Sequence, residues 1–126
     1  MDDLQQLQDQ NDLLINSIID ISNEAFRFKR VFLRAISKLD SEAQNKYASQ
    51  FAWFTKRVDK AVENAGLRII DLTGQVFDPG MAVTPLNIED FEAEDQLFIA
   101  QMMEPIIMKD DRIQKTGTVM LGRIES

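Results

Sequence analysis

Residues 4–39 read LQQLQDQNDLLINSIIDISNEAFRFKRVFLRAISKL, a stretch with neither proline nor glycine. Apolar residues recur in it at steps of three and four, and the series contains one polar residue, Asn11. This spacing predicts one continuous helix whose seam faces a partner helix along its whole length. The seam consists of Leu4, Leu7, Asn11, Leu14, Ile18, Ile21, Ala25, Phe28, Phe32, Ala35 and Leu39.

The length of this helix implies a partner. A helix of this length spans ~50 Å, whereas a single globule built from the 126 residues of the chain would be about 30 Å across. We therefore expect a homodimer in which the N-terminal seam residues of two chains meet. Asn11 either fixes the register of this pairing or marks a frayed helix end, and the sequence leaves both interpretations open. The residues expected at the dimer interface are Leu4, Leu7, Asn11, Leu14, Ile18 and Ile21.

A second helix is expected from Ser41 to about Asn64. Ser41 is a suitable N-cap, Gln44 completes a capping box three residues later, and Gly66 is typical of a helix C-terminus. The short connection predicts an antiparallel hairpin, and the second helix is too short to cover the first. Residues 1–66 are therefore expected to form a helical dimerisation stalk and bundle.

After Gly66 the sequence changes to short apolar runs separated by turn residues. Strands are expected at 67–72, 81–84, 97–108 and 113–124, with Pro105 marking a bulge or an edge in the third of them. Residues 89–95 are expected to form a solvated acidic loop or a single helical turn, and residues 109–112 a charged turn. Residues 67–126 are therefore expected to form a small, mostly antiparallel β domain. The predicted fold class is α+β, a long coiled-coil or bundle helical hairpin followed by this β domain.

The composition excludes several classes of function. The chain has no cysteine and no histidine, so disulfides, classical catalytic triads and typical zinc sites are excluded. A net charge of −7 argues against general nucleic-acid binding, and no apolar run reaches the ~20 residues of a membrane span. We expect no enzyme activity, no metal and no cofactor. The acidic N-terminus, Met1-Asp2-Asp3, is not typical of a secretory signal, so we expect a cytoplasmic protein.

Two stretches of the β domain resemble segments of GrpE-type nucleotide exchange factors. Residues 74–79, GQVFDP, resemble the GxxFDP segment that leads into the β domain of that family, and Met81-Ala82-Val83 stands where the family has His-Glu-Ala. Residues 109–119, KDDRIQKTGTV, resemble the family's closing hairpin, with Arg112 and Lys115 at the positions of two arginines. The order of long helix, shorter helix and β domain is also similar.

The resemblance implies a homodimeric co-chaperone whose β domain grips the nucleotide-binding domain of a DnaK-type chaperone ATPase. Such a grip favours the open arrangement of the ATPase, from which ADP leaves, and the co-chaperone itself performs no chemistry. By their positions, the residues expected to contact the ATPase are Phe77, Asp78, Met81, Arg112 and Lys115. A structural interpretation stays open as well, with Phe77 in the core, Asp78 in a turn and the two basic residues as solvated charges.

Two other functions fit the same sequence. A dimeric acidic secretion or assembly chaperone would bind an unfolded client on its apolar β surface and would not need the Phe77-Asp78-Pro79 segment. A purely structural oligomerisation module would need no partner other than its own copies. Because a dimer is expected under all three hypotheses, the oligomeric state alone does not separate them.

Overall fold

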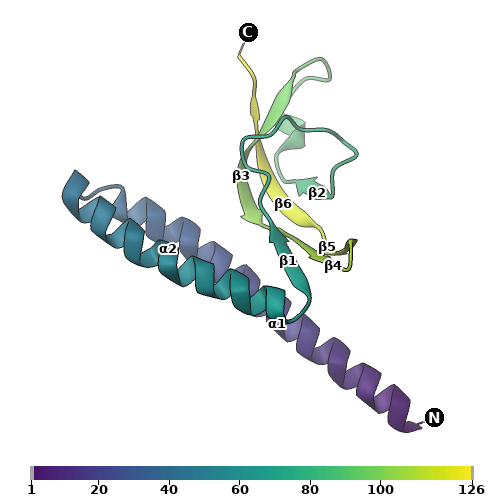
Figure 1. The fold of residues 1–126 in the computed structure, drawn as a ribbon. Coiled ribbons are helices and arrows are strands. Elements are labelled where there is room, and N and C mark those ends of the chain that lie inside the picture. Colours follow the sequence, from purple (N-terminus) through teal and green to yellow (C-terminus); the bar gives the residue numbers. More distant parts are fainter. Residues whose placement is uncertain (1, 126) are drawn as a thin grey trace. The chain divides into compact units, whose positions relative to one another are not determined.

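The computed structural model describes residues 2–125 of the chain. They divide into two compact units, a helical unit that ends at Gly66 and a β unit that begins at Leu67 (Figure 1). The first unit holds two long helices and the second holds six short strands, mostly antiparallel. The predicted α+β class is therefore confirmed. Within residues 2–125, no helix is long and apolar enough to cross a membrane.

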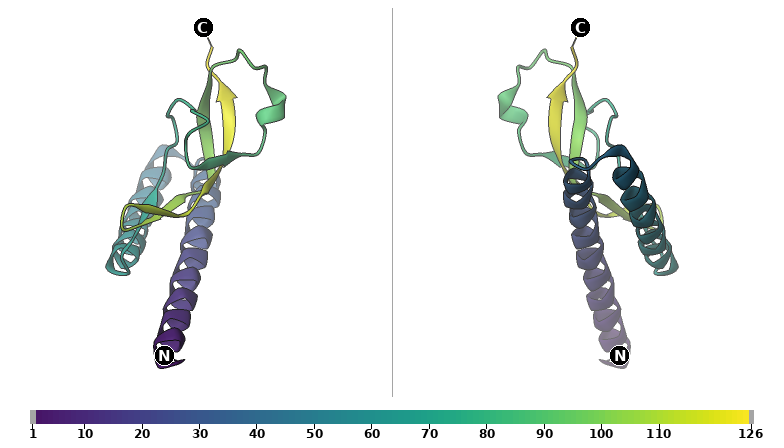
Figure 2. Two further views of the ribbon diagram at one scale, coloured as in Figure 1. Left: turned by 90° about the vertical axis from the view of Figure 1, so that its right-hand side faces the viewer. Right: turned by 90° about the vertical axis from the view of Figure 1, so that its left-hand side faces the viewer.

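The helical unit is a hairpin of α1 (Asp2–Ile36) and α2 (Ser41–Asn64), which pack side by side (Figure 2). Acidic residues in the first turn of α1 and Arg34 in its last turn suit the helix dipole. The helix ends at Ile36 rather than at the expected Leu39. The reason is a tight turn, in which the Leu39 amide donates to the Ile36 carbonyl oxygen at 3.0 Å.

The N-cap of α2 is Asp40, so the predicted capping box on Ser41 is wrong. Asp40 has an extended backbone, and its side chain accepts a hydrogen bond of 2.9 Å from the Ala43 amide. Ser41 is already the first helical residue. Gln44 does not reach back to the cap, because its side-chain amide donates to the Leu39 carbonyl oxygen at 2.7 Å. Gln44 therefore holds the connection between the two helices.

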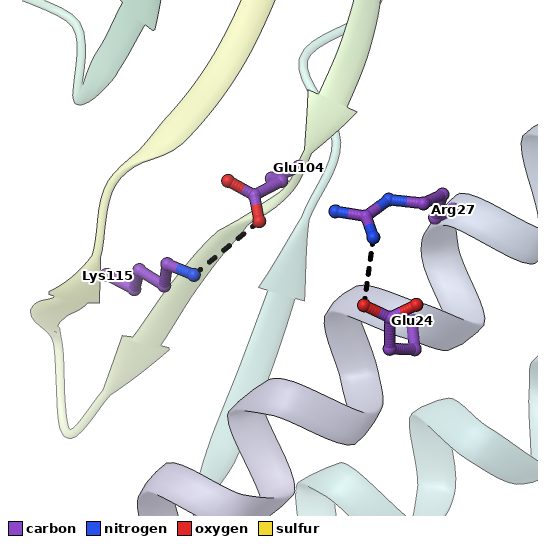
Figure 3. Close-up of polar contacts among 4 residues, drawn as sticks. All are labelled: Glu24, Arg27, Glu104 and Lys115. Carbon is purple, nitrogen blue, oxygen red and sulfur yellow. Dashed lines mark hydrogen bonds and ion pairs between the residues drawn. The ribbon is translucent and has the colours of Figure 1, made fainter.

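Aromatic rings fill the space between the two helices. The rings of Phe32 and Phe51 stack with centroids 4.6 Å apart and planes 20° apart. Phe28 and Phe54 extend this cluster at 5.7 and 5.4 Å from Phe51. Other contacts lie along one helix, such as the ion pair of 2.9 Å between Arg27 and Glu24 (Figure 3). The buried apolar side chains of the helical unit are Ile15, Ile19, Ile36, Phe51 and Val62.

The β unit contains two three-stranded sheets, with the strand orders β1-β4-β5 and β2-β6-β3. All strand pairs are antiparallel except β2 with β6. Ile99, Ile107 and Val119 are fully buried at its centre. The elements are β1 (Leu67–Ile70), β2 (Val83–Pro85), the short 3-10 helix η1 (Ile88–Asp90), β3 (Leu97–Glu104), β4 (Ile106–Lys109), β5 (Arg112–Lys115) and β6 (Gly117–Arg123).

A long, bent hairpin joins the two sheets. The strand expected at 97–108 is divided by Pro105 into β3 and β4, because proline has no amide hydrogen for the ladder. The strand expected at 113–124 is likewise divided, at Thr116, into β5 and β6. Asp110 and Asp111 make the turn at the tip with positive φ angles of 51° and 64°. Such angles are typical of tight hairpin turns, where aspartate tolerates the left-handed region.

The strand predicted at 81–84 begins later and includes Pro85. β2 covers Val83–Pro85 and pairs in parallel with the first residues of β6. The strand lies at an edge of its sheet, where a proline without an amide hydrogen is tolerated. The first strand is also shorter than expected, because β1 ends at Ile70.

Candidate functional site

The seam predicted for dimerisation is exposed on α1. Leu4, Leu7, Leu14 and Ile21 have 63%, 64%, 64% and 70% of their surface exposed. Asn11 is exposed as well, and Ile18 is half-buried. The buried residues of this part of α1, such as Ile15 and Ile19, belong to a neighbouring stripe. The single chain thus leaves an apolar stripe of α1 uncovered.

A shallow groove runs between α1 and α2, with a volume of about 560 Å³. Its walls include Leu33, Phe51 and Trp53, and its charged residues include Lys29 and Asp59. Partial burial raises the pKa of Asp59 above its ordinary value of 3.8. The ammonium group of Lys29 opposes this pKa shift, and the carboxylate of Glu63 adds to it.

Phe77 and Asp78 lie where the chain runs along the outer side of β3. The Phe77 amide donates a hydrogen bond of 2.9 Å to the Leu97 carbonyl oxygen, and its side chain is half-buried. The Asp78 carboxylate accepts from the Gly80 amide at 3.0 Å, and its carbonyl oxygen accepts from the Met81 amide at 2.9 Å. Both residues therefore have a structural role. Part of the Phe77 side chain and the exposed Asp78 are nevertheless accessible from solvent.

Met81 and Lys115 both lie within two residues in sequence of a backbone contact between Ala82 and Gly117. The Gly117 amide donates to the Ala82 carbonyl oxygen at 3.0 Å, which brings the residue after Met81 to the bend between β5 and β6. Lys115, just before this bend, has its ammonium nitrogen 3.6 Å from a carboxylate oxygen of Glu104 (Figure 3). The ammonium group of Lys115 thus forms an ion pair with the last residue of β3, which belongs to the other sheet of the β unit.

Arg112 lies farthest along the hairpin. It is the first residue of β5, is exposed, and pairs through its backbone with Lys109 next to the turn. Phe77, by contrast, contacts Leu97 at the opposite end of the β3–β4 strand. The five predicted contact residues therefore do not converge on one pocket. They are spread along the bent hairpin, as on an extended surface.

Sequence reasoning missed a groove in the β unit. This β-unit groove has a volume of about 700 Å³ and forms between residues 76–79 and the loop 88–97. The acidic loop was expected to be merely solvated. The available signal was the alternation of apolar Phe91 and Ala93 with acidic residues. The lining residues are Val76, Phe77, Pro79, Ile88, Phe91, Glu92, Ala93, Asp95, Gln96 and Leu97.

The acidic loop is held by its own hydrogen bonds. The Asp95 carboxylate accepts from the Glu92 amide at 2.9 Å, and its other oxygen lies 3.9 Å from the Arg123 guanidinium. In residues 2–125 no three acidic side chains come close enough together to hold a metal ion. All the acidic residues of the loop except Asp95 are exposed, and Glu92 and Asp95 line the groove.

No protein-family model, curated protein or solved structure matches the chain.

Proposed function

We propose that this chain is a GrpE-like homodimeric co-chaperone of the cytoplasm, which binds the nucleotide-binding domain of a DnaK-type chaperone ATPase and promotes ADP release. One observation carries the proposal. The two stretches that resemble the family, 74–79 and 109–119, belong to one small β unit. The first runs along β3 through the Phe77 hydrogen bond, and the second forms the far half of the bent hairpin.

The hairpin tip supports a role in binding. The tight turn at Asp110 and Asp111 leaves Arg112 exposed, and none of the ion pairs found within residues 2–125 involves it. A guanidinium group in such a position can form a bidentate pair with a carboxylate of a partner. Lys115 is weaker as a contact because Glu104 already neutralises part of its charge.

The helical unit supports the dimer. Its exposed seam, from Leu4 to Ile21, has the spacing of a coiled coil. In the proposed mechanism the dimer binds the open arrangement of the ATPase more tightly than the closed one. Because ADP is held poorly in the open arrangement, this difference in affinity shifts the population and releases ADP.

The test is the release of a fluorescent ADP analogue from a DnaK-type ATPase of the same organism, followed by stopped flow with and without the full chain. We expect faster release in the presence of the chain. Arg112→Ala should abolish much of the acceleration, whereas the matched control Gln114→Ala, an exposed residue of the same strand, should retain it.

A parallel pull-down of the ATPase separates the remaining outcomes. Acceleration that is insensitive to Arg112→Ala would remove the hairpin tip from the mechanism. Binding of the ATPase without faster ADP release would mean that the chain is an adaptor without exchange activity. If the chain neither binds nor accelerates, the proposal is wrong, and a client-binding chaperone or an oligomerisation module becomes the better hypothesis.

A further inference from the structure

The segment at Val76 forms an open edge beside β3. The Phe77 amide donates to the Leu97 carbonyl oxygen at 2.9 Å, and the Ile99 amide donates to the Gln75 carbonyl oxygen at 2.8 Å. These two bonds flank the antiparallel bridge between Val76 and Phe98. In this pattern the residue between the bonds turns its own N–H and C=O away from the paired strand. The backbone of Val76 therefore points outward from the sheet.

No strand of the described chain, residues 2–125, pairs with this outer edge. An unpaired edge offers hydrogen bonds to an added strand. Natural proteins often protect such edges with charge or proline, and here Pro79 follows shortly after. Val76 itself is apolar and 64% exposed, so the edge is not protected at its centre.

The β-unit groove lies alongside this edge. Val76 and Phe77 form one wall, and Ile88 and Phe91 form part of the other. Ile88 is 44% exposed, although its side chain is large and apolar. An extended segment that paired with the Val76 backbone could therefore bury alternate side chains in the groove.

The negative charge around the β-unit groove favours a partner with basic side chains. Residues 89–95 hold five acidic side chains, and residues 61–108 as a whole hold nine acidic residues against one basic residue, Arg68. In the loop, only the Asp95 carboxylate lies within ion-pair distance of a basic group among residues 2–125, at 3.9 Å from Arg123. Such a rim attracts lysine and arginine side chains and repels acidic ones.

We propose that the β-unit groove binds an extended peptide segment that combines apolar side chains with lysine or arginine, by adding a strand at Val76. The occupant is a different protein rather than a second copy. Most basic residues of this chain lie in α1 and α2, which are helical and cannot add as a strand, and in the basic strand β5 the ammonium group of Lys115 already pairs with Glu104. The net charge of −7 also opposes the docking of a second copy on an acidic groove. The proposal does not depend on the binding of an ATPase.

The probe is a short fluorescein-labelled peptide in which lysine alternates with valine, and binding to the full chain is followed by fluorescence anisotropy. Two control peptides carry glutamate in place of lysine, or serine in place of valine. We expect both controls to bind at least about tenfold more weakly, because one loses the charge attraction and the other the apolar contacts. Higher salt should weaken binding of the lysine–valine peptide, because the rim charges are exposed to solvent.

Two variants test the site itself. Val76→Pro removes the outward N–H without removing a bond to β3, and Ile88→Ser removes an exposed apolar wall. Each should weaken binding of the lysine–valine peptide about tenfold. The matched control is Ile113→Ser, because Ile113 is 52% exposed and lies in β5 of the other sheet. This variant should bind like the wild type.

Circular dichroism melting curves show whether each variant is folded. If one of the two variants does not fold, the other still tests the site. Equal binding of the lysine–serine and lysine–valine peptides would mean attraction by charge alone and would overturn the proposal. Unchanged binding by a folded Ile88→Ser variant would overturn it as well. Arg112→Ala should bind the peptide normally, which keeps this result distinct from any loss of ATPase binding.

Discussion

The side-chain amide of Asn87 forms two hydrogen bonds with the backbone of Leu121. Its nitrogen Nδ2 donates to the Leu121 carbonyl oxygen at 3.0 Å, and its oxygen Oδ1 accepts from the Leu121 amide at 2.9 Å. One residue earlier, the Leu86 amide donates to the Val119 carbonyl oxygen at 2.9 Å. Asn87 thus extends the pairing of β2 with β6 by one more step and fixes the start of the loop that forms the β-unit groove.

Asn87→Ala should therefore destabilise the β unit. The change leaves the half-buried backbone groups of Leu121 without their partner, which costs about 1–3 kcal/mol of unfolding free energy. Urea unfolding followed by circular dichroism measures this loss, and hydrogen exchange of the Leu121 amide locates it. Gln114→Ala, at an exposed position of the same unit, serves as the control. An unchanged exchange rate at Leu121 would contradict the prediction.

The cap of α2 gives a second prediction. Asp40→Ala should cost about 0.5–2 kcal/mol of stability, because the Ala43 amide loses its acceptor. Ser41→Ala should cost much less, because Ser41 lies inside the helix and is not the cap. The fluorescence of Trp53, the only tryptophan, reports unfolding of the helical unit in urea. A larger loss for Ser41→Ala than for Asp40→Ala would show that Ser41 is the cap after all.

These two contacts illustrate what the sequence could predict. The helices and the charged turn at the hairpin tip were predictable because periodicity and turn chemistry are local. The cap was misplaced by one residue because Asp40 and Ser41 are both good capping types. Only the extended backbone of Asp40 decides between them.

The β unit shows where local patterns stop being sufficient. The break at Pro105 was readable from the missing amide, but the break at Thr116 depends on the pairing of Gly117 with the distant Ala82. The β-unit groove was not predictable either, because its walls come from two separate segments, 76–79 and 88–97. Such a surface is defined by tertiary packing and has no signature in one stretch of sequence.

The exposed seam of α1 predicts that substitutions on it change the oligomeric state. Leu14→Glu combined with Ile21→Glu should convert a dimer to monomers, because each chain would bring charge into the apolar interface. Because the variant loses the burial of these apolar side chains in both chains, the dissociation constant of its dimer should be about a hundredfold or more higher than that of the wild type. Sedimentation equilibrium measures the change.

Leu13→Glu is the matched control for the seam. Leu13 is 67% exposed but lies off the seam, so the variant should remain dimeric. Equal weakening by Leu13→Glu would point to a general effect of added charge. A wild-type chain that stays monomeric at all concentrations would contradict the prediction that the seam forms a dimer interface.

At Gly117 the surrounding atoms leave no space for a Cβ atom. A Cβ atom there would lie 2.8 Å from the Glu104 carbonyl oxygen and 2.8 Å from the terminal methyl of Met102. Because the first of these is backbone, Gly117→Ala should cost about 1–3 kcal/mol through overpacking. Gly80→Ala is the control, since its nearest atom, an Asp78 carboxylate oxygen, is 3.6 Å away. Urea unfolding that fails to separate these two variants would contradict the crowding at the bend.

The raised pKa of Asp59 predicts a pH dependence of the helical unit. The folded state holds the proton of this carboxyl more tightly than the unfolded state, in which its pKa is near 3.8. The contribution of Asp59 to stability is therefore most favourable below pH 3.8 and declines as the pH rises through the higher folded pKa. At neutral pH the ionised, partly buried carboxylate destabilises the fold.

Asp59→Asn should accordingly stabilise the helical unit at pH 7, and the gain should shrink at about pH 3.5, where the wild-type carboxyl is mostly protonated in both states. Urea unfolding followed by Trp53 fluorescence at both pH values measures the difference. The control Asp12→Asn alters an exposed residue of α1 and should stay within about 0.5 kcal/mol of the wild type at pH 7. A loss of stability in Asp59→Asn at pH 7 would mean that the attraction to Lys29 outweighs the cost of burial.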